Sequence, residues 1–322
     1  MRTSYRIWDE KGKSDFRVHP RYSWKRDESG VSGAITAMLV ILILSGFLSI
    51  LYTSYIPQWT KEQEAEQMNI VLEQFLATKE TIDDQIINRE ENLNITVTNQ
   101  ITIGYGGGPV FGVGKTQGLL DVDPFHGNIT IWSNDTGTGT NETYGWGRGN
   151  ITFHSKNLEY VNQRFTYENG AVIISQEDRA VMKVDPHFYA EKDRAGDISM
   201  SMILPILVGD MQSIAGSGDV VVATTLQAVD TNEFFDWSTG RNITIDVITE
   251  FPDVWFSFFA RKLANDTSGT GMLERNATNP TGDYNITNMM NIVTGENIGV
   301  RVIIYNALSL KTDIAIVKVD LR

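Results

Sequence analysis

The sequence predicts an α+β protein in which a long N-terminal helix, with a transmembrane half and an amphipathic half, precedes a mainly antiparallel β-sandwich or jelly-roll-like domain. Three observations predict this fold class. Residues 30–60 form 31 consecutive positions without a charged side chain, more than the roughly 20 that a helix needs to cross a bilayer. A helical pattern of apolar residues follows over residues 61–87. Beyond Asn92, short strand-like runs alternate with Gly, Asn and Asp.

The predicted transmembrane helix covers residues 31–56 and follows a basic segment, residues 1–30. That segment carries eight Lys or Arg residues against five acidic ones, a balance of +3, and since the whole chain carries −13, the remainder carries −16. Lys and Arg next to a span mark its cytoplasmic side. We therefore expect a single-pass protein of the cell membrane, with a cytoplasmic N-terminus and an extracellular C-terminal domain. Aromatic residues typical of membrane interfaces flank the span: Tyr22, Trp24, Tyr52, Tyr55 and Trp59.

The composition excludes several functional classes. A strongly acidic exterior repels the phosphates of nucleic acid, so we expect no nucleic-acid partner. The chain has no cysteine, which rules out a cysteine nucleophile, a thiolate metal site and an iron–sulfur cluster. An extracellular domain of about 230 residues is large enough to be stable without disulfides.

Residues 57–90 are predicted to continue the helix as an amphipathic stalk. Pro57 is expected to kink the helix rather than end it. Apolar residues then recur at steps of three and four positions, and Glu64 and five other acidic residues lie off this stripe. The stripe must pack either against the protein's own globular domain or against a neighbouring subunit. The candidate helix–helix packing residues are Met68, Leu72 and Phe75 and, at small-xxx-small spacing in the span, Gly33 and Ala37.

Residues 91–322 are predicted to form the β-rich extracellular domain. Residues 134–149 are the longest expected loop, and residues 209–218 form a glycine-bearing connection. One helix is expected from Pro252 to Leu263, with Pro252 in its first turn and apolar residues along one side. The strand candidates are residues 94–103, 128–132, 150–154, 171–175, 181–184, 198–207, 219–227, 242–249, 299–305 and 312–321.

Asn-x-Thr sequons are numerous and all lie beyond the span. The motif accepts N-linked glycans on an exported surface. An alternative interpretation is that Asn-Ile-Thr is how many of these strands begin, since Ile and Thr favour strands. The nine candidate glycosylation sites are Asn94, Asn128, Asn134, Asn141, Asn150, Asn242, Asn265, Asn276 and Asn285.

Two motifs that suggest chemistry fail on inspection. Residues 112–116 read Gly-Val-Gly-Lys-Thr, but a phosphate-binding loop requires a glycine where Pro109 stands. His187 and Glu191 are four positions apart and can share a metal ion only on a helix, which Pro186 disfavours. We therefore expect neither a nucleotide site nor a zinc site.

Acidic pairs near turns are more ambiguous. Asp121 and Asp123, and the Asn134-Asp135 pair, carry the oxygen ligands that calcium prefers, but calcium needs six to eight converging oxygens, and solvated acidic loops are the more frequent explanation. Paired carboxylates for glycoside hydrolysis are compatible with an acidic sandwich, but no pair stands out. We predict no enzymatic activity, no catalytic residue, no cofactor and no metal site.

The order of segments resembles that of archaeal type IV pilin-like surface proteins. In these proteins a small residue, then Val-Ser, then an apolar run follow a basic leader, and residues 29–35, Ser-Gly-Val-Ser-Gly-Ala-Ile, occupy that place. The segments 56–59, 167–173 and 252–255 also look like parts of such proteins. The resemblance implies that a prepilin-type peptidase cuts between Gly30 and Val31.

The resemblance further implies a structural, assembly or adhesion role, with the membrane and other pilin-like subunits as partners through the N-terminal helix. Many pilins carry a glutamate at the position of Ile35, and most have a smaller head. A minor, tip or non-polymerising subunit is therefore the more plausible form. The alternatives are a monomeric anchored module that binds carbohydrate or an envelope protein, and an anchored hydrolase. The surface ligand is unknown.

Overall fold

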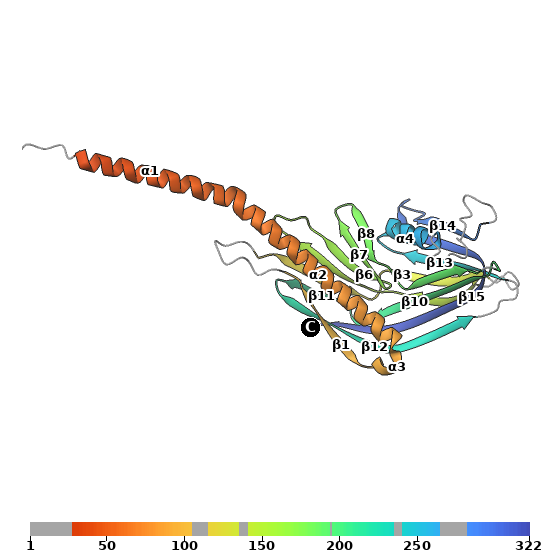
Figure 1. Ribbon diagram of the computed structural model, residues 1–322. Coiled ribbons are helices and arrows are strands. Elements are labelled where there is room, and N and C mark those ends of the chain that lie inside the picture. Colours follow the sequence, from red (N-terminus) through yellow and green to blue (C-terminus); the bar gives the residue numbers. More distant parts are fainter. Residues whose placement is uncertain (1–27, 105–114, 135–140, 194, 235–239, 265–281) are drawn as a thin grey trace, which may run out of the picture. The chain divides into compact units, whose positions relative to one another are not determined.

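The computed structural model describes residues 28–104, 115–134, 141–193, 195–234, 240–264 and 282–322. A long N-terminal helical segment precedes a mainly antiparallel β-domain (Figure 1), which confirms the predicted fold class. The chain divides between Tyr55 and Ile56 into two compact units. The predicted leader, residues 1–30, lies almost entirely outside the described residues.

The first unit contains the helix α1 (Glu28–Ile50) and the π-helical turn η1 (Leu51–Tyr55). The helical stretch Ser32–Ile87 is long and apolar enough to cross a membrane, and none of its most apolar window is buried in the protein. Helical structure continues through Pro57, as predicted. In a regular α-helix the ring of Pro57 clashes with the carbonyl of Thr53, and the wider π-turn at Thr53 is one way to relieve that clash.

Within the described residues of the second unit, most strands form a nine-stranded sheet. The long strand β15 is its centre and pairs with β10, β12, β13 and β14. The β10–β15 pairing is parallel, and the other pairings of this sheet are antiparallel. The strands are β1 (Thr96–Thr102), β3 (Asn128–Asn134), β4 (Asn141–Gly147), β9 (Phe188–Lys192), β10 (Ile198–Val208), β12 (Asp219–Phe234), β13 (Arg241–Ile248), β14 (Tyr284–Met290) and β15 (Asn297–Leu321).

The other described strands form a six-stranded antiparallel sheet in the order β11-β2-β5-β6-β7-β8. The unit also contains the helices α3 (Arg89–Asn92) and α4 (Pro252–Ala264). The strands are β2 (Gln117–Asp123), β5 (Asn150–Lys156), β6 (Arg164–Glu168), β7 (Ala171–Gln176), β8 (Arg179–Val184) and β11 (Gln212–Gly216).

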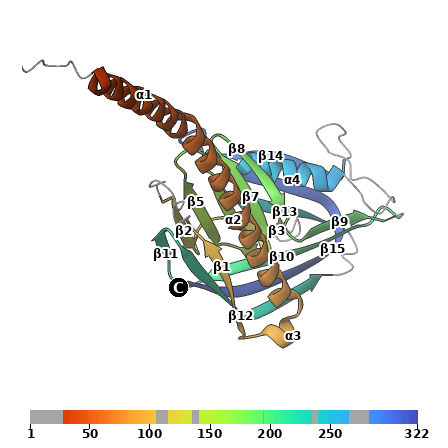
Figure 2. The ribbon, with the colours of Figure 1, turned by 60° about the vertical axis from the view of Figure 1, so that its left-hand side comes forward.

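The amphipathic helix α2 (Ile56–Ile87) packs on this β-domain and contacts both sheets, β1 and β12 on one side and β6 and β7 on the other (Figure 2). Its stripe therefore lies against the protein's own domain, one of the two predicted alternatives. Met68 and Phe75 are buried in the core, and the partly buried Leu72 packs against it, so all three residues contact the protein's own domain. The domain boundary at residues 90 and 91 stays a prediction, and by its contacts the compact unit begins at Ile56.

Two apolar cores hold the second unit together. One lies between α2 and the two sheets and contains Phe75, Phe153 and Phe165. The rings of Phe153 and Phe165 stack at a centroid distance of 5.9 Å. The other contains Trp255 and Phe258 of α4 together with residues of the nine-stranded sheet. Burial of large aromatic rings contributes strongly to such cores, because each removes much apolar area from water.

Most predicted elements are confirmed. Every predicted strand segment overlaps a strand, and the predicted helix from Pro252 to Leu263 lies within α4. Three expectations are wrong. The strand candidates 299–305 and 312–321 are parts of the single strand β15, the expected loop 134–149 contains β4, and the expected connection 209–218 contains β11. The strands β2, β6, β9 and β14 had not been predicted.

Candidate functional site

The six-stranded sheet has one apolar and one polar face. Side chains alternate along a strand, and Leu120, Ile151 and Phe165 point into the core beneath α2. Their neighbours point to the opposite face. Asp121 pairs with Thr152, which pairs with Thr166, so these residues form a row across β2, β5 and β6. Ser213 of β11 pairs with Asp121 and extends the row at the edge of the sheet.

A pocket of about 260 Å³ lies on this polar face and is called the outer pocket here. Two Asp–His pairs line it. His126 Nδ1 lies 2.5 Å from Asp123 Oδ2, and His154 Nε2 lies 3.8 Å from Asp121 Oδ2. The full lining is Asp121, Asp123, His126, Asn150, Thr152, His154, Arg164, Met211, Gln212, Ser213 and Glu250.

The charges of the outer pocket favour a neutral His154. Burial lowers the pKa of His154, and the positive charge of Arg164 lowers it further. Because the pKa of histidine is ordinarily near 6.5, His154 is uncharged at neutral pH. The carboxylates of Asp121 and Asp123 then dominate the pocket, which accepts hydrogen bonds readily and repels anions.

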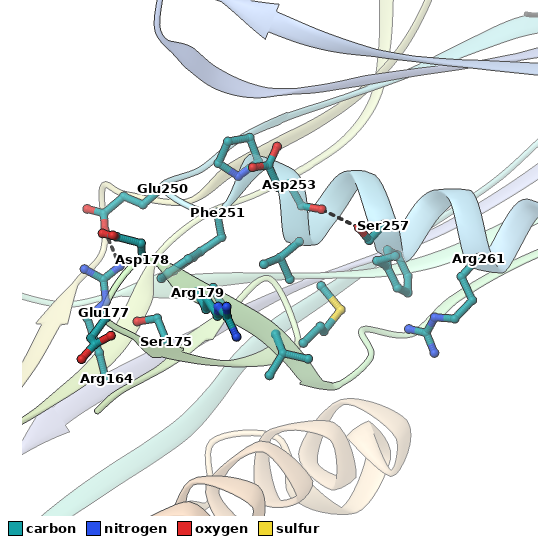
Figure 3. Close-up of a pocket in the computed structure, with 16 residues that line it drawn as sticks. Arg164, Ser175, Glu177, Asp178, Arg179, Glu250, Phe251, Asp253, Ser257 and Arg261 are labelled. Carbon is teal, nitrogen blue, oxygen red and sulfur yellow. Dashed lines mark hydrogen bonds and ion pairs between the residues drawn. The ribbon is translucent and has the colours of Figure 1, made fainter. Parts of the chain in front are cut away.

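A larger groove of about 980 Å³ lies between the β7–β8 hairpin and the start of α4. Figure 3 shows Glu250 and Phe251 above Arg164, with Ser257 and Arg261 further along α4. Arg164 and Glu250 form an ion pair and line both depressions. The Arg164 guanidinium also lies 4.6 Å from the centroid of the Phe251 ring, at cation–π distance. The ion pair therefore separates the groove from the outer pocket.

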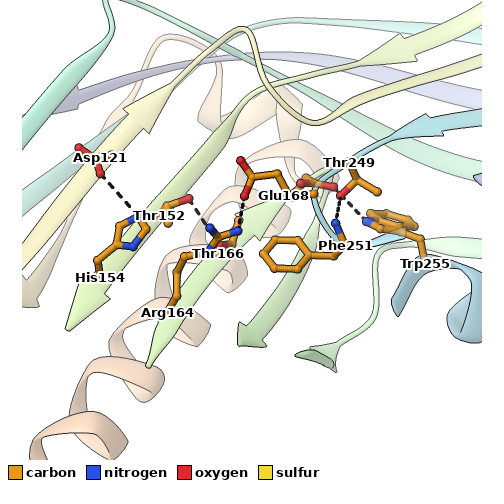
Figure 4. Close-up of polar contacts among 10 residues, drawn as sticks. Asp121, Thr152, His154, Arg164, Thr166, Glu168, Thr249, Phe251 and Trp255 are labelled. Atoms are coloured by element: carbon orange, nitrogen blue, oxygen red, sulfur yellow. Dashed lines mark hydrogen bonds and ion pairs between the residues drawn. The ribbon is translucent and has the colours of Figure 1, made fainter. Parts of the chain in front are cut away.

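Glu168, at the end of β6, ties the start of α4 to the six-stranded sheet. Its side chain is buried, and Trp255 Nε1 donates a hydrogen bond of 2.9 Å to Glu168 Oε1 (Figure 4). Burial raises the pKa of Glu168 to about 7, although hydrogen bonds from Thr249 and Trp255 oppose the shift. Glu168 lines neither depression. The shift therefore reflects the burial of Glu168 beside α4.

Several sequons lie at the beginning of a strand. Asn128, Asn141 and Asn150 are the first residues of β3, β4 and β5. The isoleucines of the Asn-Ile-Thr sequons beginning at Asn128, Asn150, Asn242 and Asn285 are buried, so these sequons also act as strand sequences. Asn94, Asn128, Asn141 and Asn242 are exposed, and Asn150 and Asn285 are half-buried. Asn265, Asn276 and the side chain of Asn134 lie outside the described residues.

The described part of the chain holds no group of three or more His, Cys, Asp or Glu residues arranged to bind a metal ion. Glu191 lies in the strand β9 and His187 directly precedes it, so the two residues do not share a helix. His187 Nε2 lies 3.0 Å from Asp83 Oδ2. Asp121 and Asp123 each face a histidine instead of converging on one point. Asp135 and the glycines of the segment 112–114 lie outside the described residues.

The residues around the ion pair had not been predicted from the sequence. Arg164, Thr166 and Glu168 alternate with two buried aromatic residues over the five residues of β6. This period-two pattern is a strand signal with one polar face, so it offered a way to find the site. No such signal indicated that Glu250 and Trp255 contribute to the site. Glu250 is 86 positions from its partner Arg164, and Trp255 is 87 positions from its partner Glu168.

The fold and the site define a protein with an N-terminal apolar helix and a β-sandwich domain that carries a charged pocket on its smaller sheet. The chain belongs to a family of unknown function (DUF7289), which matches residues 127–287, half of the chain. The match begins just before β3 and ends within β14, so it contains Arg164, Glu168 and α4 and leaves out α1 and α2. No curated protein and no solved structure matches the chain.

Proposed function

We propose that this chain is a membrane-anchored, pilin-like subunit of the cell surface with a structural, assembly or adhesion role. One observation carries the proposal. The helix α1 leaves its large apolar side chains exposed, for example Met38 at 74% and Ile41 at 66%, whereas α2 buries its stripe in the β-domain. Exposed apolar surface of this extent marks a membrane or an interaction site. The proposed protein is therefore archaeal and type IV pilin-like. Its helix α1 lies in lipid before it packs against the corresponding helices of other subunits.

The orientation proposed is a cytoplasmic N-terminus and an extracellular β-domain, since the basic segment precedes the span. Gly33 and Ala37 remain the proposed contacts between α1 helices. A side chain at Gly33 meets no atom within 4 Å, so the helix surface there is open to a close neighbour. The role proposed is not enzymatic, because the buried acid with the raised pKa, Glu168, lines neither depression.

Mass measurement of the native N-terminus tests this proposal. Cleavage between Gly30 and Val31 gives a mature chain that begins at Val31. The variant Gly30→Leu, which places a bulky residue before the cut, should retain the leader. Gly46→Leu is the matched control, because it makes the same change further along α1, where a Cβ also meets no atom within 4 Å, and it should be processed normally.

An intact leader in the native protein contradicts the pilin-like assembly role. It favours the second candidate, a monomeric anchored binding module, for which the outer pocket on the six-stranded sheet is the supporting observation. In the Gly30→Leu variant, which keeps the leader, protease added to whole cells should digest the β-domain and spare the N-terminal basic segment. Digestion of the basic segment on intact cells contradicts the proposed orientation.

We also propose glycosylation of the exposed sequons, Asn94, Asn128, Asn141 and Asn242. Mass spectrometry of peptides from the native protein should find glycans at these positions and less modification at the half-buried Asn285. Unmodified peptides at all four exposed sequons favour the alternative, in which Asn-x-Thr serves only as a strand sequence.

A further inference from the structure

An exposed aromatic group lies beside the outer pocket and has no role in the core. The rings of Phe125 and Trp146 are 59% and 42% exposed. The guanidinium of Arg148 lies 5.5 Å from the centroid of the Phe125 ring and 5.2 Å from that of Trp146. These three residues are called the aromatic platform. Two exposed rings that share one guanidinium form an amphipathic surface.

Glycines alternate with two platform residues, Trp146 and Arg148, at the end of β4, and they hold this part of the platform close to β10. A Cβ on Gly145 would lie 2.6 Å from Leu204 Cδ1, and one on Gly147 would lie 3.0 Å from the carbonyl oxygen of Pro205. Only glycine permits such close approach to β10. Side chains alternate along a strand, so Trp146, between the two glycines, points away from β10.

The platform continues into the outer pocket through the β2–β3 turn. The backbone N–H of Phe125 donates to Asp123 Oδ1 at 2.8 Å, and the neighbouring His126 contacts the other oxygen of the same carboxylate. The carbonyl of His126 accepts a hydrogen bond of 2.7 Å from the N–H of Gly149, the residue after Arg148. Asp123 therefore fixes both the edge of the pocket and the position of Phe125.

The turn is also held from the other side. Asn169 Nδ2 donates to the carbonyl of Gly127 at 2.6 Å, and the side chain of Glu168 fills the space where Gly127 would carry a Cβ. Binding sites hold ligands well when their residues are positioned before the ligand arrives. The outer pocket and the platform are preorganised in this sense.

We propose that the outer pocket and the aromatic platform together bind a neutral oligosaccharide. A sugar ring offers C–H groups to the faces of aromatic rings and hydroxyl groups to polar side chains. The carboxylates of Asp121 and Asp123 accept hydrogen bonds from hydroxyl groups. The guanidinium of Arg148, a half-buried residue, carries N–H groups that donate to sugar oxygens.

The charge of the pocket selects against acidic sugars. Asp121 and Asp123 line the pocket, Arg164 is paired with Glu250, and burial lowers the pKa of His154. A uronic acid or sulfated sugar would therefore meet two carboxylates with little compensating positive charge. The inference rests on the proposed surface location, since an extracellular domain encounters glycans, and it gives the adhesion role a ligand class.

The sugar has two sources that share one chemistry. It is either a glycan of the surroundings or a glycan of this chain. Asn150, a sequon residue, lines the outer pocket, and Asn128, another, begins β3 directly after the turn. A glycan on Asn150 starts at the lining of the pocket, and a glycan on Asn128 starts two positions after His126, which lines it. Protein made with and without N-glycosylation distinguishes the two sources.

The test uses the full-length chain in a zwitterionic detergent, because alkyl-glycoside detergents carry competing sugars. The probes are the neutral hexasaccharides cellohexaose, maltohexaose and mannohexaose, with hexagalacturonate as the acidic probe. Saturation-transfer NMR and tryptophan fluorescence report binding. Unglycosylated protein should bind at least one neutral probe. Trp146→Ala and Asp121→Asn should each weaken binding at least tenfold, and the matched control Ile292→Ala, which removes another exposed apolar side chain, should leave it unchanged.

Each outcome decides the inference. Absence of binding to all neutral probes by both protein forms overturns it, and so does preference for hexagalacturonate or unchanged binding in Trp146→Ala. Binding by the unglycosylated form alone, restored when the N-glycans are removed from the glycosylated protein, identifies the chain's own glycan as the occupant. Leader processing at Gly30 is measured independently, so loss of sugar binding with normal processing leaves the pilin-like proposal intact.

Discussion

The carboxylate of Glu64 on α2 accepts hydrogen bonds from three successive backbone N–H groups. Glu64 Oε1 lies 2.7 Å from the nitrogen of Leu158, and Oε2 lies 2.9 Å and 2.7 Å from those of Glu159 and Tyr160. Consecutive N–H groups that converge in this way form an anion-binding concavity. Here the helix supplies the anion, and Glu64 is only 1% exposed. The contact therefore fastens the β5–β6 connection to the beginning of α2.

Glu64→Gln should destabilise the second unit by about 2–3 kcal/mol. The amide has one acceptor oxygen in place of two charged ones, so at least one of the three N–H groups loses its partner, and hydrogen bonds to charged groups contribute about 1.5–3 kcal/mol each. Denaturant unfolding of the full chain in detergent measures the change. Hydrogen exchange should also increase at residues 158–160.

Glu66→Gln is the matched control for this measurement. Glu66 is exposed two positions further along the same helix, and exposed substitutions of this kind change stability by about 0.5 kcal/mol or less. Equal losses in the two variants would show that Glu64 acts through helix charge rather than through the three N–H groups.

Glu168 makes the stability of the second unit depend on pH. Its pKa is raised from 4.5 to about 7 in the folded protein by burial. The folded state therefore holds a proton that the unfolded state has lost between these two values. The contribution of Glu168 to stability is fully present below about pH 4.5, falls as the pH rises toward about 7, and is lost above it. The total contribution lost is about 3 kcal/mol.

Glu168→Gln should remove this slope. The amide oxygen still accepts the hydrogen bond from Trp255 Nε1, and the side chain no longer titrates. The difference in unfolding free energy between pH 5 and pH 8, measured for both proteins, checks the prediction, and Glu296→Gln at an exposed position serves as control. An unchanged slope in Glu168→Gln would assign the pH dependence to another group.

The helical segment is the part of the fold that the sequence predicts best. Its signals are local, since the uncharged span and the three-and-four spacing are both contained in residues 30–87. The burial of Glu64 was not predictable in the same way. Its partners are 94 to 96 positions away, and a glutamate off the apolar stripe indicates a solvated face unless those partners are known.

The strand β4 shows a second limit of sequence reasoning. Glycine weakens a strand and is typical of turns, so the run Gly145-Trp146-Gly147-Arg148-Gly149 predicts a loop. In the fold, however, the glycines give β10 the space to approach closely. The same missed element carries Trp146, so the candidate site was missed with it. Asp121 and Asp123 had been noticed from the sequence, but their pairing with His154 and His126 depends on tertiary structure.

Asp83 joins α2 to the loop before β9, and its loss should be costly. It forms a buried ion pair with Lys79, and its Oδ2 lies 3.0 Å from His187 Nε2. Asp83→Asn leaves the Lys79 ammonium buried without its counter-ion, which costs about 3–5 kcal/mol. Asp84→Asn, at the exposed neighbouring position, should change stability by about 0.5 kcal/mol or less. Denaturation midpoints of the two variants compare them, and similar midpoints would contradict the buried ion pair.

Truncation of two phenylalanines on the same helical stretch should change the stability of the second unit by very different amounts. Phe75 is 1% exposed in α2, with its ring 6.0 Å from that of Phe165, whereas Phe47 is 60% exposed in α1. Phe75→Ala leaves a cavity in the core between the two sheets and should destabilise the second unit by about 3–5 kcal/mol. Phe47→Ala removes a ring of the proposed membrane span, so unfolding of the β-domain should change by about 0.5 kcal/mol or less. Thermal unfolding followed by the far-ultraviolet strand signal measures both variants in detergent. A large loss in Phe47→Ala would mean that α1 packs against the β-domain, which would remove the reason for placing α1 in a membrane.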